Sequence, residues 1–128
     1  MVFYIGLFAV FGSLFRYGVG IAVAAWPSAP FPIATLTVNL VGCFALSLVH
    51  AYVDRERYPE WLKNAVSIGF IGSFTTFSAF GAETMILFQN GLWGMMAAYI
   101  FTTLIGGLGF AMMGRRLGRR FWEEGEEA

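Results

Sequence analysis

Four long apolar stretches constrain the fold of this 128-residue chain more than any other feature of its sequence. They cover about residues 2–25, 33–53, 61–88 and 92–113, and proline, charged residues or a glycine turn separate them. Each is close to the roughly 20 residues that an α-helix needs to cross the hydrocarbon core of a bilayer. The pattern predicts an all-α membrane protein, a single domain of four transmembrane helices with a charged tail over residues 114–128.

The composition agrees with a chain that is solvated by lipid. Charged residues make up only 12% of the sequence, whereas soluble domains carry about 25%. The formal net charge is zero, which argues against a nucleic-acid partner because such a partner calls for a basic face. The single cysteine, Cys43, excludes an intrachain disulfide, and neither Cys43 nor the single histidine, His50, has the spacing of a metal site.

The basic residues predict the orientation of the chain in the membrane. With four spans, both termini and the loop between the second and third spans lie on one side. That side holds Lys63, the loop arginines Arg55 and Arg57 and the four tail arginines, whereas the other two loops carry no Lys or Arg. The positive-inside rule therefore places both termini in the cytoplasm. The acidic end, residues 123–127, is expected to be frayed and solvated.

A run of small and polar residues interrupts the third apolar stretch. Residues 72–78 read Gly-Ser-Phe-Thr-Thr-Phe-Ser. Serine and threonine hydroxyls compete for backbone carbonyls, and glycine weakens a helix further. Membranes tolerate a broken helix where its freed carbonyls are buried or bind ions. We predict a break in mid-membrane whose carbonyls suit a small cation; the alternative is a mild kink satisfied by neighbouring helices.

Three polar side chains inside the spans are candidates for function, because polar groups are costly in lipid. Arg16 lies well inside the first span, where it either faces a watery vestibule that attracts anions or snorkels to the nearer membrane surface. Asn39 is the deepest amide of the second span, and it either donates to a passing anion or joins two helices by a hydrogen bond. Glu83 is the only acid within these predicted spans, and it either has a functional role or makes a hydrogen bond between two helices.

Aromatic and hydroxyl side chains follow the polar run. Phe77 and Phe80 are three residues apart and share one helix face. Lipid-facing packing is the default for phenylalanine, but a ring edge beside a pore is electropositive and can face an anion. Tyr99 and Thr103 share a face of the fourth span, where they either continue a track of hydroxyls or bond to their own backbone.

Three stretches of the sequence together resemble the small bacterial fluoride channels called CrcB or Fluc. They are residues 12–17 (Gly-Ser-Leu-Phe-Arg-Tyr), 35–44 (Thr-Leu-Thr-Val-Asn-Leu-Val-Gly-Cys-Phe) and 69–80 (Gly-Phe-Ile-Gly-Ser-Phe-Thr-Thr-Phe-Ser-Ala-Phe). The resemblance covers essentially the whole chain, and the third stretch is highly specific. Ser13 and Ala79 depart from the usual pattern; neither change removes a side chain expected to meet fluoride, but Ala79 costs one hydroxyl.

The resemblance implies a fluoride-selective channel in the bacterial inner membrane that exports fluoride passively from the cytoplasm. It also implies an antiparallel dimer with two pores, surrounded by lipid. Backbone carbonyls of Gly72 and Thr75 from both subunits would hold a central sodium ion, which is structural and is not transported. The roles that it implies for side chains are a fluoride donor for Asn39, pore-lining rings for Phe77 and Phe80, a polar track for Glu83, Tyr99 and Thr103, and a vestibule for Arg16.

Two other classes of function fit parts of the sequence. A proton-coupled small multidrug exporter also has four short spans in an antiparallel dimer, but it needs a titrating carboxylate, for which Glu83 is the only candidate. A non-transporting assembly subunit would use its polar clusters only to bind other helices. The bias of seven basic residues on one side against none on the other also leaves open a heterodimer with an oppositely oriented paralogue, besides a homodimer.

Overall fold

A computed structural model of the chain describes residues 1–25, 30–53 and 58–126. Within these ranges the chain is helical and has no strand. Four segments are long and apolar enough to cross a membrane: Val2–Ala24, Ile33–Tyr52, Glu60–Gln89 and Trp93–Phe121. The all-α fold with four membrane-spanning segments is therefore confirmed, and the chain is a multi-pass membrane protein. Trp26, Pro27, Arg55 and Arg57, which entered the predictions of span ends and orientation, lie outside the described residues.

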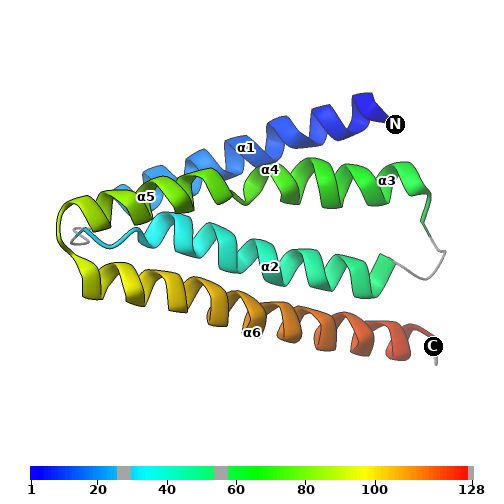
Figure 1. The fold of residues 1–128 in the computed structure, drawn as a ribbon. Helices are drawn as coiled ribbons and strands as arrows, with labels where there is room; N and C mark the ends of the chain where they lie inside the picture. Colours follow the sequence, from blue (N-terminus) through cyan, green and yellow to red (C-terminus); the bar gives the residue numbers. More distant parts are fainter. Residues whose placement is uncertain (26–29, 54–57, 127–128) are drawn as a thin grey trace.

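The third span is built from several helical pieces, whereas the other three are single helices. The order along the chain is α1 (Val2–Ala24), α2 (Ile33–Val53), α3 (Glu60–Asn64), the π-helix η1 (Ala65–Ile71), α4 (Gly72–Phe74), α5 (Phe77–Gln89) and α6 (Trp93–Glu126). Both termini and the start of α3 lie at one end of the bundle, and the turn between α5 and α6 lies at the other (Figure 1). This arrangement is the one expected of an even number of spans.

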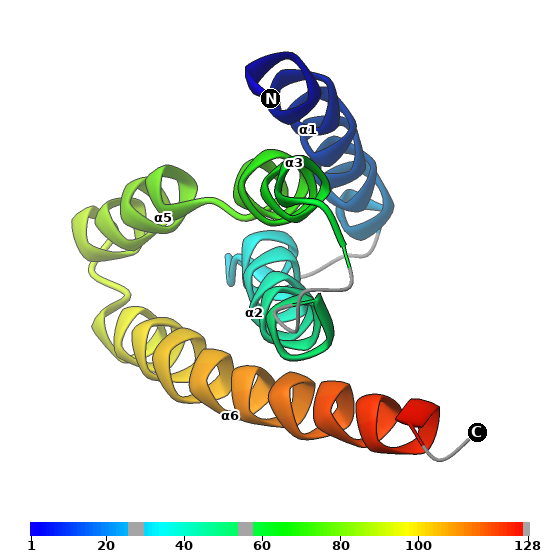
Figure 2. The ribbon, with the colours of Figure 1, turned by 90° about the vertical axis from the view of Figure 1, so that its right-hand side faces the viewer.

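Helix α2 occupies the middle of the bundle. It packs along α6 on one side, while α1 packs mainly on η1 and α4. Seen end-on, α5 is displaced sideways from α3 and lies beside the beginning of α6 (Figure 2). The second half of the third span thus leaves the α1 side of the molecule and crosses toward α6, so that residues of α2, α5 and α6 meet.

The displacement of α5 begins at two residues with extended backbone. Helix α4 ends at Phe74, Thr75 has a ψ of 157°, and Thr76 has a φ of −148° and a ψ of 124°. The hydroxyl oxygen of Thr76 accepts a hydrogen bond from the Ala79 N–H at 3.2 Å and so caps the start of α5. Threonine is a favoured residue at this position of a helix. The interruption lies within the polar run of residues 72–78.

The π-helix η1 was not foreseen from the sequence. Its buried residues are Ala65, Gly69 and Ile71, and a Cβ atom added to Gly69 would lie 2.6 Å from the backbone oxygen of Ile5 in α1. Small residues let two membrane helices approach this closely. The packing of α1 against η1 keeps the first half of the third span beside α1, whereas the second half, α5, lies beside the beginning of α6.

Helix α6 continues far beyond the expected end of the fourth span near residue 113. A Cβ atom on Gly114 would collide with the backbone oxygen of Phe44, and one on Gly118 would lie 2.8 Å from that of Leu48. These two glycines let α6 pack against α2 beyond residue 113, and the helix extends to Glu126. The expectation of a frayed acidic end is therefore wrong as far as Glu126.

Candidate functional site

The side chain of Asn39 is hydrogen-bonded to the backbone at the interruption of the third span. Its Nδ2 group donates to the backbone oxygen of Thr76 at 2.9 Å, and its Oδ1 atom accepts from the Thr76 N–H at 2.9 Å. The Thr76 N–H, which no helical carbonyl accepts, and the Thr76 C=O, at the start of α5, are thus both paired with the amide of Asn39. An asparagine NH2 group carries two donors, and only one is used by the described residues. Asn39 therefore joins two helices and also keeps one donor for another acceptor.

Arg16 faces a cavity of about 520 Å³ beside the interruption. The other walls include Thr35 and Val38 of α2 and Thr76 and Ala79 near the start of α5. Arg16 also donates to the backbone oxygen of Thr75 through Nη1, at a long 3.4 Å. The vestibule and the snorkelling interpretations of this arginine both stay predictions. Ala79, which lacks the hydroxyl that its relatives were expected to have, is part of the same wall.

A cluster of three hydrogen-bonding side chains joins α2, α5 and α6. The Thr35 hydroxyl donates to Oε1 of Glu83 at 2.7 Å, and the Tyr99 hydroxyl donates to Oε2 at 2.7 Å. Thr35 and Tyr99 are buried, with exposed fractions of 8% and 0%. Both oxygens of the Glu83 carboxyl group therefore accept hydrogen bonds from hydroxyl groups of neighbouring helices.

Aromatic rings connect the start of α5 to this cluster. The ring centroids of Phe77 and Phe80 are 5.9 Å apart, and those of Phe80 and Tyr99 are 5.2 Å apart. Phe77 is 84% exposed, whereas Phe80 is half-buried. The two phenylalanines thus form a row that leads from the surface of this chain to Tyr99 and Glu83.

Thr103 lies next to the cluster without donating to it. Its hydroxyl donates to the backbone oxygen of Tyr99 at 2.7 Å, which is the local backbone bond that competes with a role in a hydroxyl track. The oxygen of Thr103 retains acceptor capacity, but its donor is used. Within the described chain, then, Thr103 supports the position of Tyr99 rather than facing the carboxylate.

The two backbone carbonyls considered for a cation differ in their surroundings. The Gly72 carbonyl accepts no hydrogen bond from the residues that the structure describes, because the Thr76 N–H is used by Asn39. Gly72 is also exposed. The Thr75 carbonyl faces Arg16 at the long distance given above, and the Thr75 hydroxyl donates to the Ile71 oxygen at 3.0 Å. No group of three or more His, Cys, Asp or Glu side chains that could hold a metal occurs in the described ranges.

Thr35 is the member of the site to which sequence reasoning assigned no role. The signal was its spacing: Thr35, Asn39 and Gly42 are four and three residues apart, so they share the face of α2 that meets the third span. Gly42 lies directly against the Thr75 methyl group. Ser73 supports the site from the other side, since its hydroxyl donates to the Ala9 oxygen of α1 at 2.8 Å.

Comparisons with known proteins cover most of the chain, including every residue of the candidate site. A family model described as "CrcB-like protein, Camphor Resistance (CrcB)" matches residues 3–115. The chain is 38% identical to fluoride-specific ion channel FluC 2 of Listeria monocytogenes, over 96% of this chain and 94% of that protein. It is 43% identical to FluC 2 of Geobacillus kaustophilus over 81% of each chain. It is 37% identical to FluC 1 of Bacillus cereus over 89% of this chain and 84% of the relative.

The names of these relatives denote ion channels, which is a non-enzymatic function. The matched residues include all three stretches that carried the resemblance, and the identities extend over most of each relative. The chain therefore belongs to the CrcB-like protein family.

Proposed function

We propose that this chain forms a fluoride-selective ion channel through which fluoride leaves the cytoplasm passively, lowering its concentration in the cell. The observation that carries this proposal is the row of neutral donors and ring edges around the interruption, in a chain similar to proteins named fluoride-specific channels. The bacterial inner membrane is the expected location.

Fluoride is small and strongly hydrated, so a pore must replace its water with donors at each step and still release it. The Arg16 cavity offers a cation at the entrance, which raises the local anion concentration. The hydroxyl of Thr35 in the wall of this cavity and the second N–H of Asn39 on the same helix are donors of the right kind. The electropositive edges of Phe77 and Phe80 lie farther along α5 and provide a weaker contact that favours release.

Glu83 has a different role in this proposal, because a carboxylate repels an anion. It keeps the Thr35 and Tyr99 hydroxyls oriented toward one point from opposite sides. A hydroxyl that rotates away from Glu83 donates to fluoride and returns when the ion has passed. The rotation moves no proton between residues, so the flow needs no proton gradient.

The assay that tests this function measures fluoride efflux from liposomes that contain the purified chain. We expect rapid fluoride loss without a proton gradient and slow chloride loss under the same conditions. Flux that requires a proton gradient would support the multidrug exporter instead. A well-folded protein without fluoride flux, either alone or together with an oppositely oriented paralogue, would leave only the assembly subunit. Flux from the chain alone would exclude a strict heterodimer.

The sodium ion and the antiparallel dimer belong to the same proposal. Gly72 is exposed and its carbonyl accepts no hydrogen bond from the described residues, so this carbonyl is available as a hard oxygen ligand. Two antiparallel copies would bring two such carbonyls together with those of Thr75, whose second lone pair is free beside Arg16. A bound sodium ion would hold the two interruptions together and lower the local cost of anions.

Removing sodium should weaken the dimer. In detergent, exchange of sodium for N-methylglucamine should lower the thermal midpoint of the dimer and increase the monomer fraction, with potassium chloride at equal ionic strength as the control for salt effects. A dimer that is equally stable in all three salts would contradict the sodium site while leaving fluoride conduction untouched.

The phenylalanine rings give a direct test of the route. Phe77→Ile and Phe80→Ile should each keep the fold and reduce fluoride flux by about tenfold or more, since loss of a 1.4 kcal/mol contact slows passage tenfold. Phe101→Ile is the matched control, because Phe101 is exposed on α6 and outside the ring row. Native flux in both pore variants would show that the rings serve only packing.

A further inference from the structure

The outer face of α6 changes from apolar to strongly basic at one level along its axis. The exposed apolar side chains on this face are Leu104, Ile105, Leu108 and Met112. Four exposed arginines follow: Arg115, Arg116, Arg119 and Arg120. With 3.6 residues per turn, these arginines occupy the same side of the helix as the apolar residues. Gly114 and Gly118 face the opposite way, against α2, so the packing of α6 turns the arginines outward.

The length of the apolar segment sets the depth of the arginines. From Trp93 to Met113, α6 rises by about 30 Å, which equals the thickness of the hydrocarbon core of a bilayer. From Arg115 to Arg120 it rises by about 7.5 Å, close to the thickness of one headgroup layer. A helix that spans the membrane along this segment therefore holds its four guanidinium groups at the level of the lipid phosphates.

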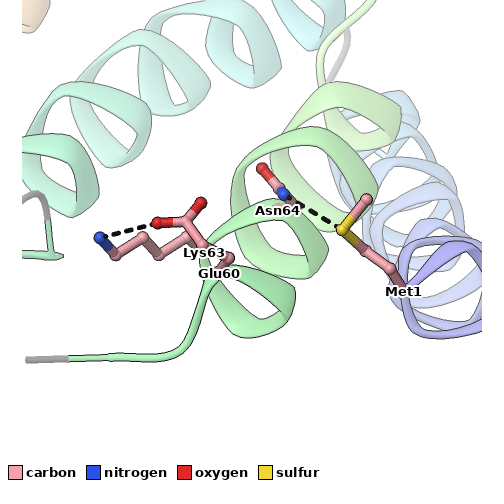
Figure 3. Close-up of polar contacts among 4 residues, drawn as sticks. All are labelled: Met1, Glu60, Lys63 and Asn64. Atoms are coloured by element: carbon pink, nitrogen blue, oxygen red, sulfur yellow. Dashed lines mark hydrogen bonds and ion pairs between the residues drawn. The ribbon is translucent and has the colours of Figure 1, made fainter. Parts of the chain in front are cut away.

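No protein group competes for these guanidinium groups among the described residues. None of the four arginines takes part in a hydrogen bond or ion pair there. Lys63, the other described basic residue at this end, is already paired with Glu60 at 3.3 Å, as Figure 3 shows. The glutamates of the tail follow the arginines in the sequence.

We propose that the arginine face of α6, formed by Arg115, Arg116, Arg119 and Arg120, binds the phosphates of anionic phospholipids in the leaflet at the C-terminal end. A guanidinium group binds phosphate through two parallel hydrogen bonds, and the negative leaflet adds attraction to the whole cluster. The apolar residues above the arginines contact the acyl chains of the same lipids. This site does not depend on fluoride conduction; it depends only on the chain spanning a bilayer.

The test measures which lipids contact the intact protein in a phosphatidylcholine bilayer. Electron paramagnetic resonance compares immobilised spin-labelled phosphatidylglycerol with immobilised spin-labelled phosphatidylcholine. At low salt we expect about a fivefold preference for phosphatidylglycerol, the equivalent of about 1 kcal/mol for an arginine near an anionic lipid. At about 1 M salt, where the screening length falls to about 3 Å, the preference should nearly disappear.

Two variants that replace the same four arginines test whether their positive charge attracts the anionic lipids. R115Q/R116Q/R119Q/R120Q should lose most of the preference while phosphatidylcholine contact stays native, and R115K/R116K/R119K/R120K should keep most of it. Phosphate buffer should reduce the preference no more than chloride at equal ionic strength. The proposal is overturned by a preference that survives in the glutamine variant, by its absence in the native protein, or by specific displacement with free phosphate. Native circular dichroism in the glutamine variant keeps its result interpretable.

Discussion

Asn39→Leu should abolish fluoride flux and destabilise the fold at the same time. The substitution removes both hydrogen bonds to the backbone N–H and C=O of Thr76, and with them the amide donor that Asn39 offers to a passing ion. Each orphaned backbone group in an apolar environment costs about 1–3 kcal/mol, so the thermal midpoint in detergent should fall clearly. Loss of about 3 kcal/mol of stabilisation for the passing ion would slow flux by about a hundredfold. Liposome efflux and thermal unfolding measure the two effects separately.

Two further variants separate support of the backbone from contact with fluoride. Asn39→Asp keeps an oxygen that accepts the Thr76 N–H but has no donor and carries a charge, so it should lose flux with a smaller loss of stability. Asn64→Leu is the matched control: Asn64 is on the third span and donates only to the Met1 sulfur at 3.6 Å (Figure 3). Native flux in Asn39→Asp or in Asn39→Leu would show that the amide only joins helices.

Gly42→Ala should have the second-largest effect, through geometry rather than through lost bonds. A Cβ atom at this position would overlap the Thr75 methyl carbon Cγ2. Relief requires either a rotation of the Thr75 side chain, which breaks its hydroxyl bond to the Ile71 oxygen, or a separation of α2 from the third span, which stretches the 2.9 Å bonds between Asn39 and Thr76. Overpacking of this kind costs about 1–3 kcal/mol. We therefore expect a lower thermal midpoint and a fall in fluoride flux.

A second substitution at the point of collision should restore the protein. Thr75→Ser removes Cγ2 but keeps the hydroxyl that donates to the Ile71 oxygen. The double variant Gly42→Ala/Thr75→Ser should recover most of the stability and flux, which a double-mutant cycle expresses as a coupling energy. Gly109→Ala is the control, because a Cβ atom there meets no atom within 4 Å. If Thr75→Ser fails to rescue, the methyl contact is not the cause of the defect.

The sequence alone predicts which polar residues lie inside the spans, because the free-energy cost of a polar group in lipid depends only on its position in an apolar stretch. Arg16, Asn39 and Glu83 stand out in apolar stretches whatever the helices around them do. The spacing of Phe77 and Phe80 likewise predicts a shared helix face. Their partners could not be read in the same way. Asn39 meets Thr76 and Glu83 meets Thr35 across sequence separations of 37 and 48 residues, and no local pattern specifies such pairs.

The same distinction explains the two departures from expectation in the helices. A π-helix over Ala65–Ile71 has no compositional signature; it appears where α1 comes close to Gly69. The end of the fourth span was expected near residue 113, because the sequence turns from apolar to charged there. The glycines that keep α6 on α2, Gly114 and Gly118, look like tail residues until the opposite helix face is known.

The sequence by itself determined that this protein crosses the membrane four times, which side carries its basic residues, and where its third span is interrupted. These follow from the length of apolar stretches and from the cost of polar groups in lipid, both of which act residue by residue. Only the tertiary structure decided that Asn39 pairs with the backbone N–H and C=O of Thr76, that Thr35 and Tyr99 share one carboxylate, and that α6 turns its arginines outward. Those outcomes depend on which helix faces meet, and packing between distant segments sets them.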